Sequence, residues 1–182
     1  MTYRATILAV TVALSSPAIV TAHAFEITSS DFTDGGRLQK AQVGIGAECA
    51  GGNVSPALAW KDPPPGTRSF ALTMFDPDAH GGVWHWGVFG IAADVEALAG
   101  NAGSSDATLP KGAHHALNTR RMAAYFGACP PAGPPHHYIV TLYALKTAKP
   151  AGFKAAAGAA ALGRLVSAEA VGKATITGLY GK

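Results

Sequence analysis

Residues 138–145, YIVTLYAL, form the strongest strand signal of the sequence, because β-branched and aromatic residues fill most of the segment. Residues 69–75 (SFALTMF) and 85–91 (HWGVFGI) are apolar or Thr almost throughout, so they predict strands buried on both faces, although two glycines weaken the second. Residues 174–180 (ATITGLY) return to strand character near the C-terminus. The core is therefore expected to consist mainly of β-strands.

Turn-forming residues separate these strands, and one predicted helix lies late in the sequence, after most of the strands. Prolines and glycines exclude regular structure at residues 62–66 (DPPPG) and 127–135 (GACPPAGPP), and residues 100–106 form a polar loop. Residues 153–170 are rich in Ala and Leu, with large apolar residues at helical spacing. Strands and helices do not alternate regularly, so we expect a β-sandwich with short peripheral helices rather than a doubly wound sheet.

The composition sets limits on the class of protein. The chain has 182 residues, of which 48% are hydrophobic and only 14% charged, and its net charge is +3. This length and apolar content suit one folded domain, and the weak, scattered positive charge does not indicate a nucleic-acid partner. Twenty-two glycines and 12 prolines argue against a coiled coil or a helical bundle.

The first 24 residues are typical of a Sec-type secretory signal peptide. Arg4 precedes a short apolar run, and the AHA sequence at residues 22–24 matches a small-x-small cleavage site. The apolar run is shorter than the span of about 20 residues that a membrane helix needs, and no later segment is long and apolar enough. We therefore expect a mature domain of residues 25–182, beginning at Phe25, without a transmembrane segment and located in the periplasm or secreted.

Export bears on the two cysteines of the sequence. Cys49 and Cys129 lie 80 positions apart, outside any CxxC or zinc-ligand spacing. In an oxidising compartment an even pair favours a disulfide, while two buried free thiols are the alternative.

Histidine and aspartate residues gather at the predicted strand ends, where a rigid scaffold positions the groups of a preformed pocket. The clusters are His80 and His85 beside Asp76 and Asp78, the pair His114-His115, and the pair His136-His137. Taken singly, each of these residues is more typical of a structural role, such as an Asp capping a turn. Their joint placement favours a binding site, and for His114-His115 we expect a solvated loop.

Several motifs in a fixed order give the chain a resemblance to a known family. They are residues 49–60 (CAGGNVSPALAW), residues 67–77 (TRSFALTMFDP), Trp84-His85-Trp86, Cys129-Pro130-Pro131, His136-His137-Tyr138, and the terminal ATITGLYG. Together they resemble the phosphatidylethanolamine-binding protein family, in particular its bacterial Raf kinase inhibitor-like (YbhB/YbcL-type) branch, over nearly the whole mature chain. The resemblance implies a sandwich of two antiparallel β-sheets with peripheral helices.

The resemblance also implies a pocket for phosphate-like or carboxylate anions, including phosphoethanolamine head groups. Its ligand-binding residues would be Asp76, Asp78, His85, His136 and Tyr138, with Trp84 and Cys129 lining the mouth. The chain departs from the family pattern at His80, where family members usually have proline, and at Ala128 in the GACPP run.

Chemistry suggests a role for each group in such a pocket. Imidazole and tyrosine hydroxyl groups can donate hydrogen bonds to an oxyanion, whereas an ionised carboxylate cannot. We therefore expect His85, His136 and Tyr138 to contact the anion, Asp76 to orient His85, and His137 to point away by strand alternation. Because histidine normally titrates at about 6.5, the affinity for the anion is expected to rise as the pH falls from 8 to 6.

Other classes of function fit the sequence less well. A metal site built from Asp76, Asp78, His85 and His136 lacks the usual short ligand spacings, and a Ser55–His85–Asp76 hydrolase triad lacks a G-x-S-x-G elbow. We therefore expect neither an enzyme nor a cofactor. An extracytoplasmic protein-interaction modulator or inhibitor remains an alternative, with its partner unidentified.

Overall fold

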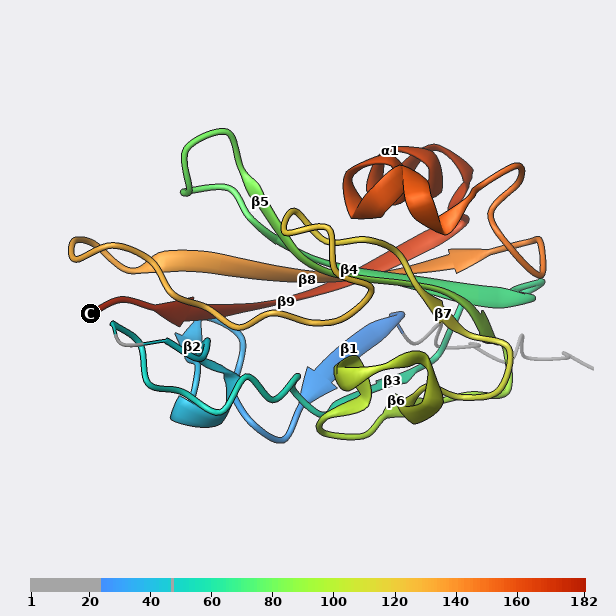
Figure 1. The fold of residues 1–182 in the computed structure, drawn as a ribbon. Helices are drawn as coiled ribbons and strands as arrows, with labels where there is room; N and C mark the ends of the chain where they lie inside the picture. Colours follow the sequence, from blue (N-terminus) through green and yellow to red (C-terminus); the bar gives the residue numbers. More distant parts are fainter. Residues whose placement is uncertain (1–23, 47) are drawn as a thin grey trace, which may run out of the picture.

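A six-stranded sheet lies at the centre of the molecule, between a three-stranded sheet on one face and an α-helix on the other (Figure 1). The computed structural model describes residues 24–46 and 48–182. The large sheet has the order β2-β9-β8-β4-β5-β7, with bounds Gly36–Arg37, Gly172–Tyr180, His136–Leu145, Ser69–Asp76, Val83–Ala92 and His114–His115. The small sheet has the order β1-β3-β6, with bounds Glu26–Ser29, Leu58–Lys61 and Ala97–Leu98.

The predicted fold class is confirmed, with one exception to the antiparallel pairing. Neighbouring strands pair antiparallel throughout both sheets except for β2, which pairs parallel to β9. Short 3-10 helices connect the strands at Lys40–Gln42, Ala102–Ser104, Asp106–Thr108 and Ala155–Ala157. Within the described ranges, no helix combines the length and apolar character of a membrane span.

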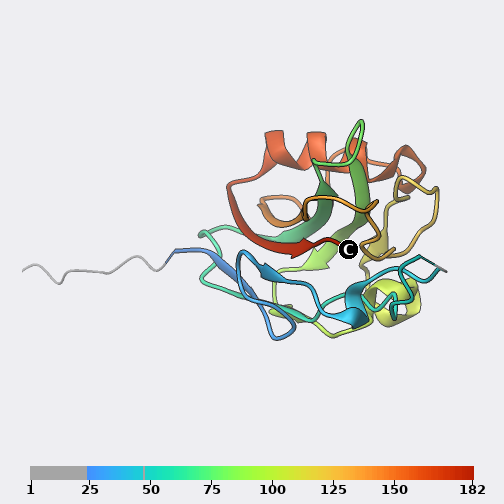
Figure 2. The same ribbon diagram turned by 90° about the vertical axis from the view of Figure 1, so that its left-hand side faces the viewer.

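Burial on both faces explains the apolar sequences of the central strands. One cluster of buried side chains fills the space between the two sheets, and a second lies between the large sheet and α1 (Gly158–Glu169). Figure 2, turned by 90°, again shows the helix and the small sheet on opposite sides of the large one. Strand β4 contributes to both clusters and is buried at nearly every position, as its unbroken apolar sequence predicts.

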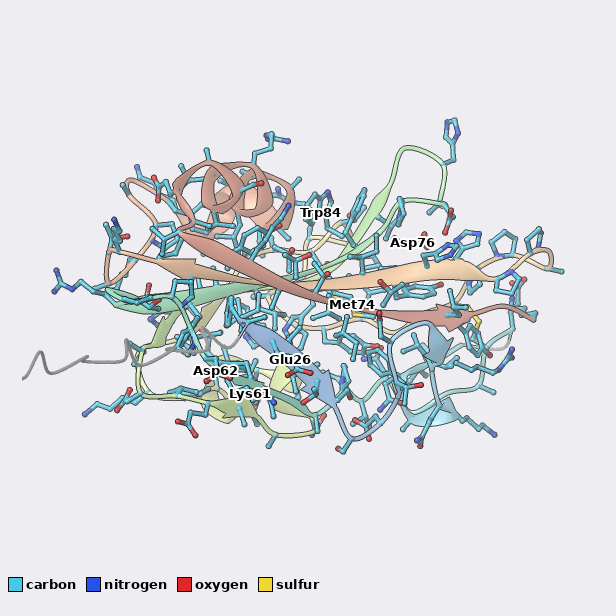
Figure 3. The ribbon with its side chains drawn as sticks, turned by 180° about the vertical axis from the view of Figure 1, so that it is seen from behind. Glu26, Lys61, Asp62, Met74, Asp76 and Trp84 are labelled. Atoms are coloured by element: carbon cyan, nitrogen blue, oxygen red, sulfur yellow. A yellow bond between two sulfur atoms is a disulfide. The ribbon has the colours of Figure 1, made fainter. Side chains whose placement is uncertain are left out.

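The helix starts later than its composition predicts. Residues 155–157 form a 3-10 turn, and Gly158 adopts a positive φ of 83°, which redirects the chain before α1 begins. A side chain at Gly163 would overlap the Trp84 ring, so the glycine lets the helix approach the sheet closely. Figure 3 shows Trp84 beside the helix and Asp76 farther along the sheet.

A β-bulge interrupts the pairing of β4 with β5. Met74 lies opposite Trp86 and Phe75 lies opposite Trp84, so His85 is the extra residue. Because of the bulge, Trp84 packs toward α1 while Trp86 is buried between the sheets. Trp60 and Trp86 both belong to the core between the sheets.

Two expectations concern the chain outside the sheets. The cysteines Cys49 and Cys129 form a disulfide, with 5.8 Å between their Cα atoms. Nearly all of the expected signal peptide, residues 1–23, lies outside the described residues.

Candidate functional site

A pocket of about 430 Å³ opens at the end of the large sheet where β4 ends and β5 and β8 begin. The C-terminus lies at the same end (Figure 1). The lining of the pocket comes from the three strands, from the loop after β4 and from residues 119–131. The lining residues are Asp76, Asp78, Ala79, His80, Val83, His85, Thr119, Arg120, Phe126, Cys129, Pro130, Pro131, His136 and Tyr138.

Asp76 is buried at the last position of β4 and accepts three hydrogen bonds. Its Oδ1 accepts from the backbone N–H groups of Asp78 at 2.9 Å and Ala79 at 3.1 Å, which form the turn after the strand. Its Oδ2 lies 2.8 Å from Nδ1 of His136. An ionised carboxylate only accepts, so Nδ1 carries the hydrogen and Nε2 of His136 is left for other partners.

His85 occupies the bulge and has a different partner from the expected one. Its Nδ1 lies 2.8 Å from the carbonyl oxygen of Phe126, so the prediction that Asp76 orients His85 is wrong. The ring is packed between aromatic side chains, with its centroid 4.2 Å from that of Phe126 and 5.1 Å from that of Tyr138. Burial lowers the pKa of His85 to about 4, so this ring is neutral at the pH values at which we expected it to gain charge.

Tyr138 lies on β8 two positions after His136, and both residues line the pocket. Burial raises the pKa of the Tyr138 hydroxyl, with a smaller contribution from the charge of Asp76. The hydroxyl therefore keeps its proton and remains a hydrogen-bond donor at neutral pH.

Arg120 is the main residue that the sequence analysis missed. Its guanidinium carbon lies 4.7 Å from the centroid of the Phe126 ring, and both side chains line the pocket. The loop that carries it is organised by the buried Asn118, whose Oδ1 accepts from Arg120 N at 2.9 Å and whose Nδ2 donates to Ala124 O at 2.8 Å. No motif identifies this arginine; only the turn-forming Asn118 at the start of the loop offers a signal.

A smaller hollow of about 160 Å³ adjoins the pocket and shares Arg120, Phe126 and Cys129 with it. Ile45 and Met122 line this hollow and are 74% and 41% exposed.

Asp78, His80 and His137 lie at or near the rim. Asp78 Oδ2 accepts from the backbone N–H of His137 at 2.6 Å and lies 2.8 Å from its Nδ1. These hydrogen bonds, the backbone one foremost, lower the pKa of Asp78. His80 lines the pocket, whereas His137 is exposed and does not, in agreement with strand alternation.

Two sequence-based placements need correction. Trp84 does not line the pocket, because it faces the helix, with its ring centroid 4.4 Å from that of Phe75. The His114-His115 pair is not a solvated loop but strand β7, at the edge of the large sheet. His115 is buried, and its Nδ1 lies 2.7 Å from Asp106 Oδ1.

The geometry bears on the two catalytic alternatives. Ser55 is buried away from the pocket and accepts a hydrogen bond from Gly103 N at 2.8 Å, so it does not join His85 and Asp76 in a triad. Among residues 24–46 and 48–182, no three His, Cys, Asp or Glu side chains converge as metal ligands would.

Comparison with known proteins gives consistent matches over most of the chain. The profile of the family described as phosphatidylethanolamine-binding protein matches residues 28–181. The chain is 43% identical to the YbcL protein of Escherichia coli over 163 residues, which are 87% of this chain and 88% of YbcL. It is 40% identical over 142 residues to a protein of Mycobacterium tuberculosis named putative lipoprotein LppC, covering 77% of this chain and 64% of that protein.

Solved structures agree with the sequence comparison. The crystal structure of E. coli YbcL, described as a new member of the mammalian PEBP family, superposes with a TM-score of 0.83 at 40% identity, covering 88% of this chain and 99% of that one. A putative phosphatidylethanolamine-binding protein homologue from Chlamydia trachomatis gives a TM-score of 0.71 at 26% identity, covering 87% and 98%.

Proposed function

The chain belongs to the phosphatidylethanolamine-binding protein family, and from this premise we propose that it holds a small phosphate- or carboxylate-bearing ligand in the pocket beside β4, β5 and β8. A phosphoethanolamine-like head group is one such ligand. The convergence of Arg120, Tyr138 and two histidines on one pocket carries the proposal.

Three of these groups have a definite part in the proposed binding. Arg120 supplies a permanent positive charge, and Tyr138 supplies a buried hydroxyl donor. His136 is held by Asp76, so its ring is fixed before the ligand arrives. Preorganised polar groups reduce the entropy lost on binding.

The proposed role is binding rather than catalysis. The hydroxyl of Thr119 accepts a hydrogen bond from Trp84 N at 2.8 Å, and the sulfur of Cys129 is part of the disulfide. Neither group is paired with a base in the way that an activated nucleophile requires.

We also propose that the protein is exported to the periplasm or beyond. The pattern of the first 24 residues, the disulfide between Cys49 and Cys129, and a relative named as a putative lipoprotein all support export. Sequencing the N-terminus of the exported form should give Phe25, and an intact Met1 on exported material would contradict the proposal.

Calorimetric titration with acetate and phosphoethanolamine at pH 6 tests the binding function. His136→Ala or Arg120→Ala should weaken binding by on the order of 1.5–3 kcal/mol, the range for hydrogen bonds to charged groups. His137→Ala is the matched control, because its ring is exposed outside the pocket and its backbone N–H still anchors Asp78. Equal binding by wild type and both pocket variants would show that the ligand does not bind here.

A further inference from the structure

Two of the three histidines that line the pocket, His85 and His136, direct the same ring nitrogen toward a protein acceptor. Nδ1 of His85 faces the carbonyl oxygen of Phe126, and Nδ1 of His136 faces the carboxylate of Asp76, both at 2.8 Å. Both partners accept hydrogen bonds, so each Nδ1 carries a hydrogen. In a neutral ring, the remaining Nε2 is then an acceptor and cannot donate to an anion, whereas both nitrogens of a protonated ring donate.

His85 remains neutral in spite of its charged surroundings. The residue is 3% exposed, and its burial outweighs the hydrogen bond to Phe126 and the charge of Asp76 on β4, which both favour protonation. Arg120 on its loop and His136 on β8 oppose protonation. The other titratable groups on the pocket wall are Tyr138, Asp78 and His80.

A fully ionised anion would therefore meet a lone pair at Nε2 of His85. A ligand with an acidic proton avoids this repulsion, because its O–H can donate to Nε2. The other oxygens of the same ligand can accept from Arg120 and from the Tyr138 hydroxyl.

We propose, resting on the anion-binding function above, that His85 makes the pocket selective for ligands that are both anionic and proton-bearing, such as the monoanion of a phosphomonoester. The P–OH group donates to Nε2 of His85, and the charged oxygens face Arg120 and Tyr138. An anion without such a proton binds only when one proton is taken up from solution onto His85. The phosphodiester of an intact phospholipid has no P–OH and belongs to this second, disfavoured class.

Methyl phosphate and dimethyl phosphate test this selectivity directly. At pH 5.5 most of the methyl phosphate is a monoanion with one P–OH, because the second pKa of a phosphomonoester is about 6. Dimethyl phosphate has the same charge and no P–OH. Since the pKa of His85 is about 4, protonating it at pH 5.5 weakens diester binding by about 30-fold relative to the monoester.

Calorimetry in two buffers with different heats of ionisation should show about one proton taken up per dimethyl phosphate bound at pH 5.5. Methyl phosphate should take up far less. The affinity for dimethyl phosphate should fall about tenfold per pH unit above the pKa of His85, whereas that for methyl phosphate should stay nearly constant up to about pH 6.

His85→Asn is the informative variant, because its side-chain amide can still donate to the Phe126 carbonyl but lacks the Nε2 acceptor. It should bring the monoester-to-diester ratio close to one and remove the proton uptake, while His137→Ala should leave both unchanged. The contrary result is that wild type binds both esters with similar affinity and without proton uptake, while His136→Ala and Arg120→Ala still weaken that binding. This result would overturn the selectivity and leave the anion-binding function standing. Absence of saturable binding of both esters and of acetate would overturn the proposed function itself.

Discussion

Replacing Asp76 by Asn should reverse the hydrogen-bonding polarity of His136. The amide keeps one oxygen, which can still accept from the backbone N–H groups of Asp78 and Ala79. Its nitrogen then faces Nδ1 of His136, where the carboxylate Oδ2 stood at 2.8 Å. Two donors cannot pair, so the neutral ring is expected to change tautomer, with Nδ1 accepting and Nε2 carrying the hydrogen toward the pocket.

The stability cost follows from the three hydrogen bonds of Asp76. In Asp76→Asn all three can form, but without charge assistance, which should lower the free energy of unfolding by about 1–2 kcal/mol. In Asp76→Ala all three are lost. The bond to His136 is the most buried, with side chains 4% and 14% exposed, while the two backbone donors lie in a turn open to water. The Ala variant should therefore lose about 3–5 kcal/mol.

For Asp76→Asn, the change in binding should be opposite in sign to the change in stability. Asp76→Asn adds a donor at Nε2 of His136 and removes a negative charge beside the pocket, so acetate should bind more tightly than to wild type at pH 8. Asp76→Ala frees the His136 ring and should weaken binding.

Urea denaturation gives the stabilities, calorimetry gives the affinities, and imidazole ¹⁵N chemical shifts distinguish the two tautomers. His136 with a hydrogen still on Nδ1 in Asp76→Asn would refute the reasoning. Weaker acetate binding by that variant would refute it independently.

Three further predictions concern stability. Burial lowers the pKa of His85 from 6.5 to about 4, so between these pH values the unfolded chain takes up a proton that the folded chain does not. As the pH falls through this range, the free energy of unfolding should fall by on the order of 3 kcal/mol. Urea denaturation measures it, and the same pH dependence in wild type and His85→Asn would contradict the prediction. Replacing Cys49 and Cys129 by Ser opens a disulfide that spans 80 positions and should cost about 4 kcal/mol in the chain-entropy model, measured by denaturation against the oxidised wild type, with equal stability as the contradicting result. Gly163→Ala should gain about 1 kcal/mol of stability from helix propensity but lose about 1–3 kcal/mol because its methyl group overlaps Trp84. The net loss of stability should be smaller when Trp84→Leu is added. A higher melting temperature for Gly163→Ala alone would show that the helix moves away without cost.

The large sheet was predictable because its strands are buried on both faces. A strand covered on one side by a sheet and on the other by a helix needs apolar residues at nearly every position, as β4 shows. The short strands were not predictable in this way. His114 and His115 form β7 only because β5 offers Val88 and Phe89 as pairing partners, and nothing in the local sequence reports that contact.

The candidate site was predictable in its residue types but not in its connections. Motifs led to Asp76, His85, His136 and Tyr138, which all line the pocket, because strand ends keep their positions when loops vary. Arg120 lies in an irregular loop whose shape depends on buried Asn118, so its side chain could not be assigned to the pocket from the chain alone.

The partner of His85 depends on geometry that residue types do not encode. Simple alternation would place Trp84 and Trp86 on the same face, but the bulge at His85 separates them and leaves His85 and Trp86 on the side of the small sheet. There, His85 meets a backbone carbonyl 41 positions away, and any residue at position 126 would supply the same oxygen. The carbonyl places the hydrogen on Nδ1, and burial keeps the ring neutral. The acceptor that His85 turns to the pocket therefore follows from the path of the backbone, which is why the pattern of histidines and aspartates pointed to a donor.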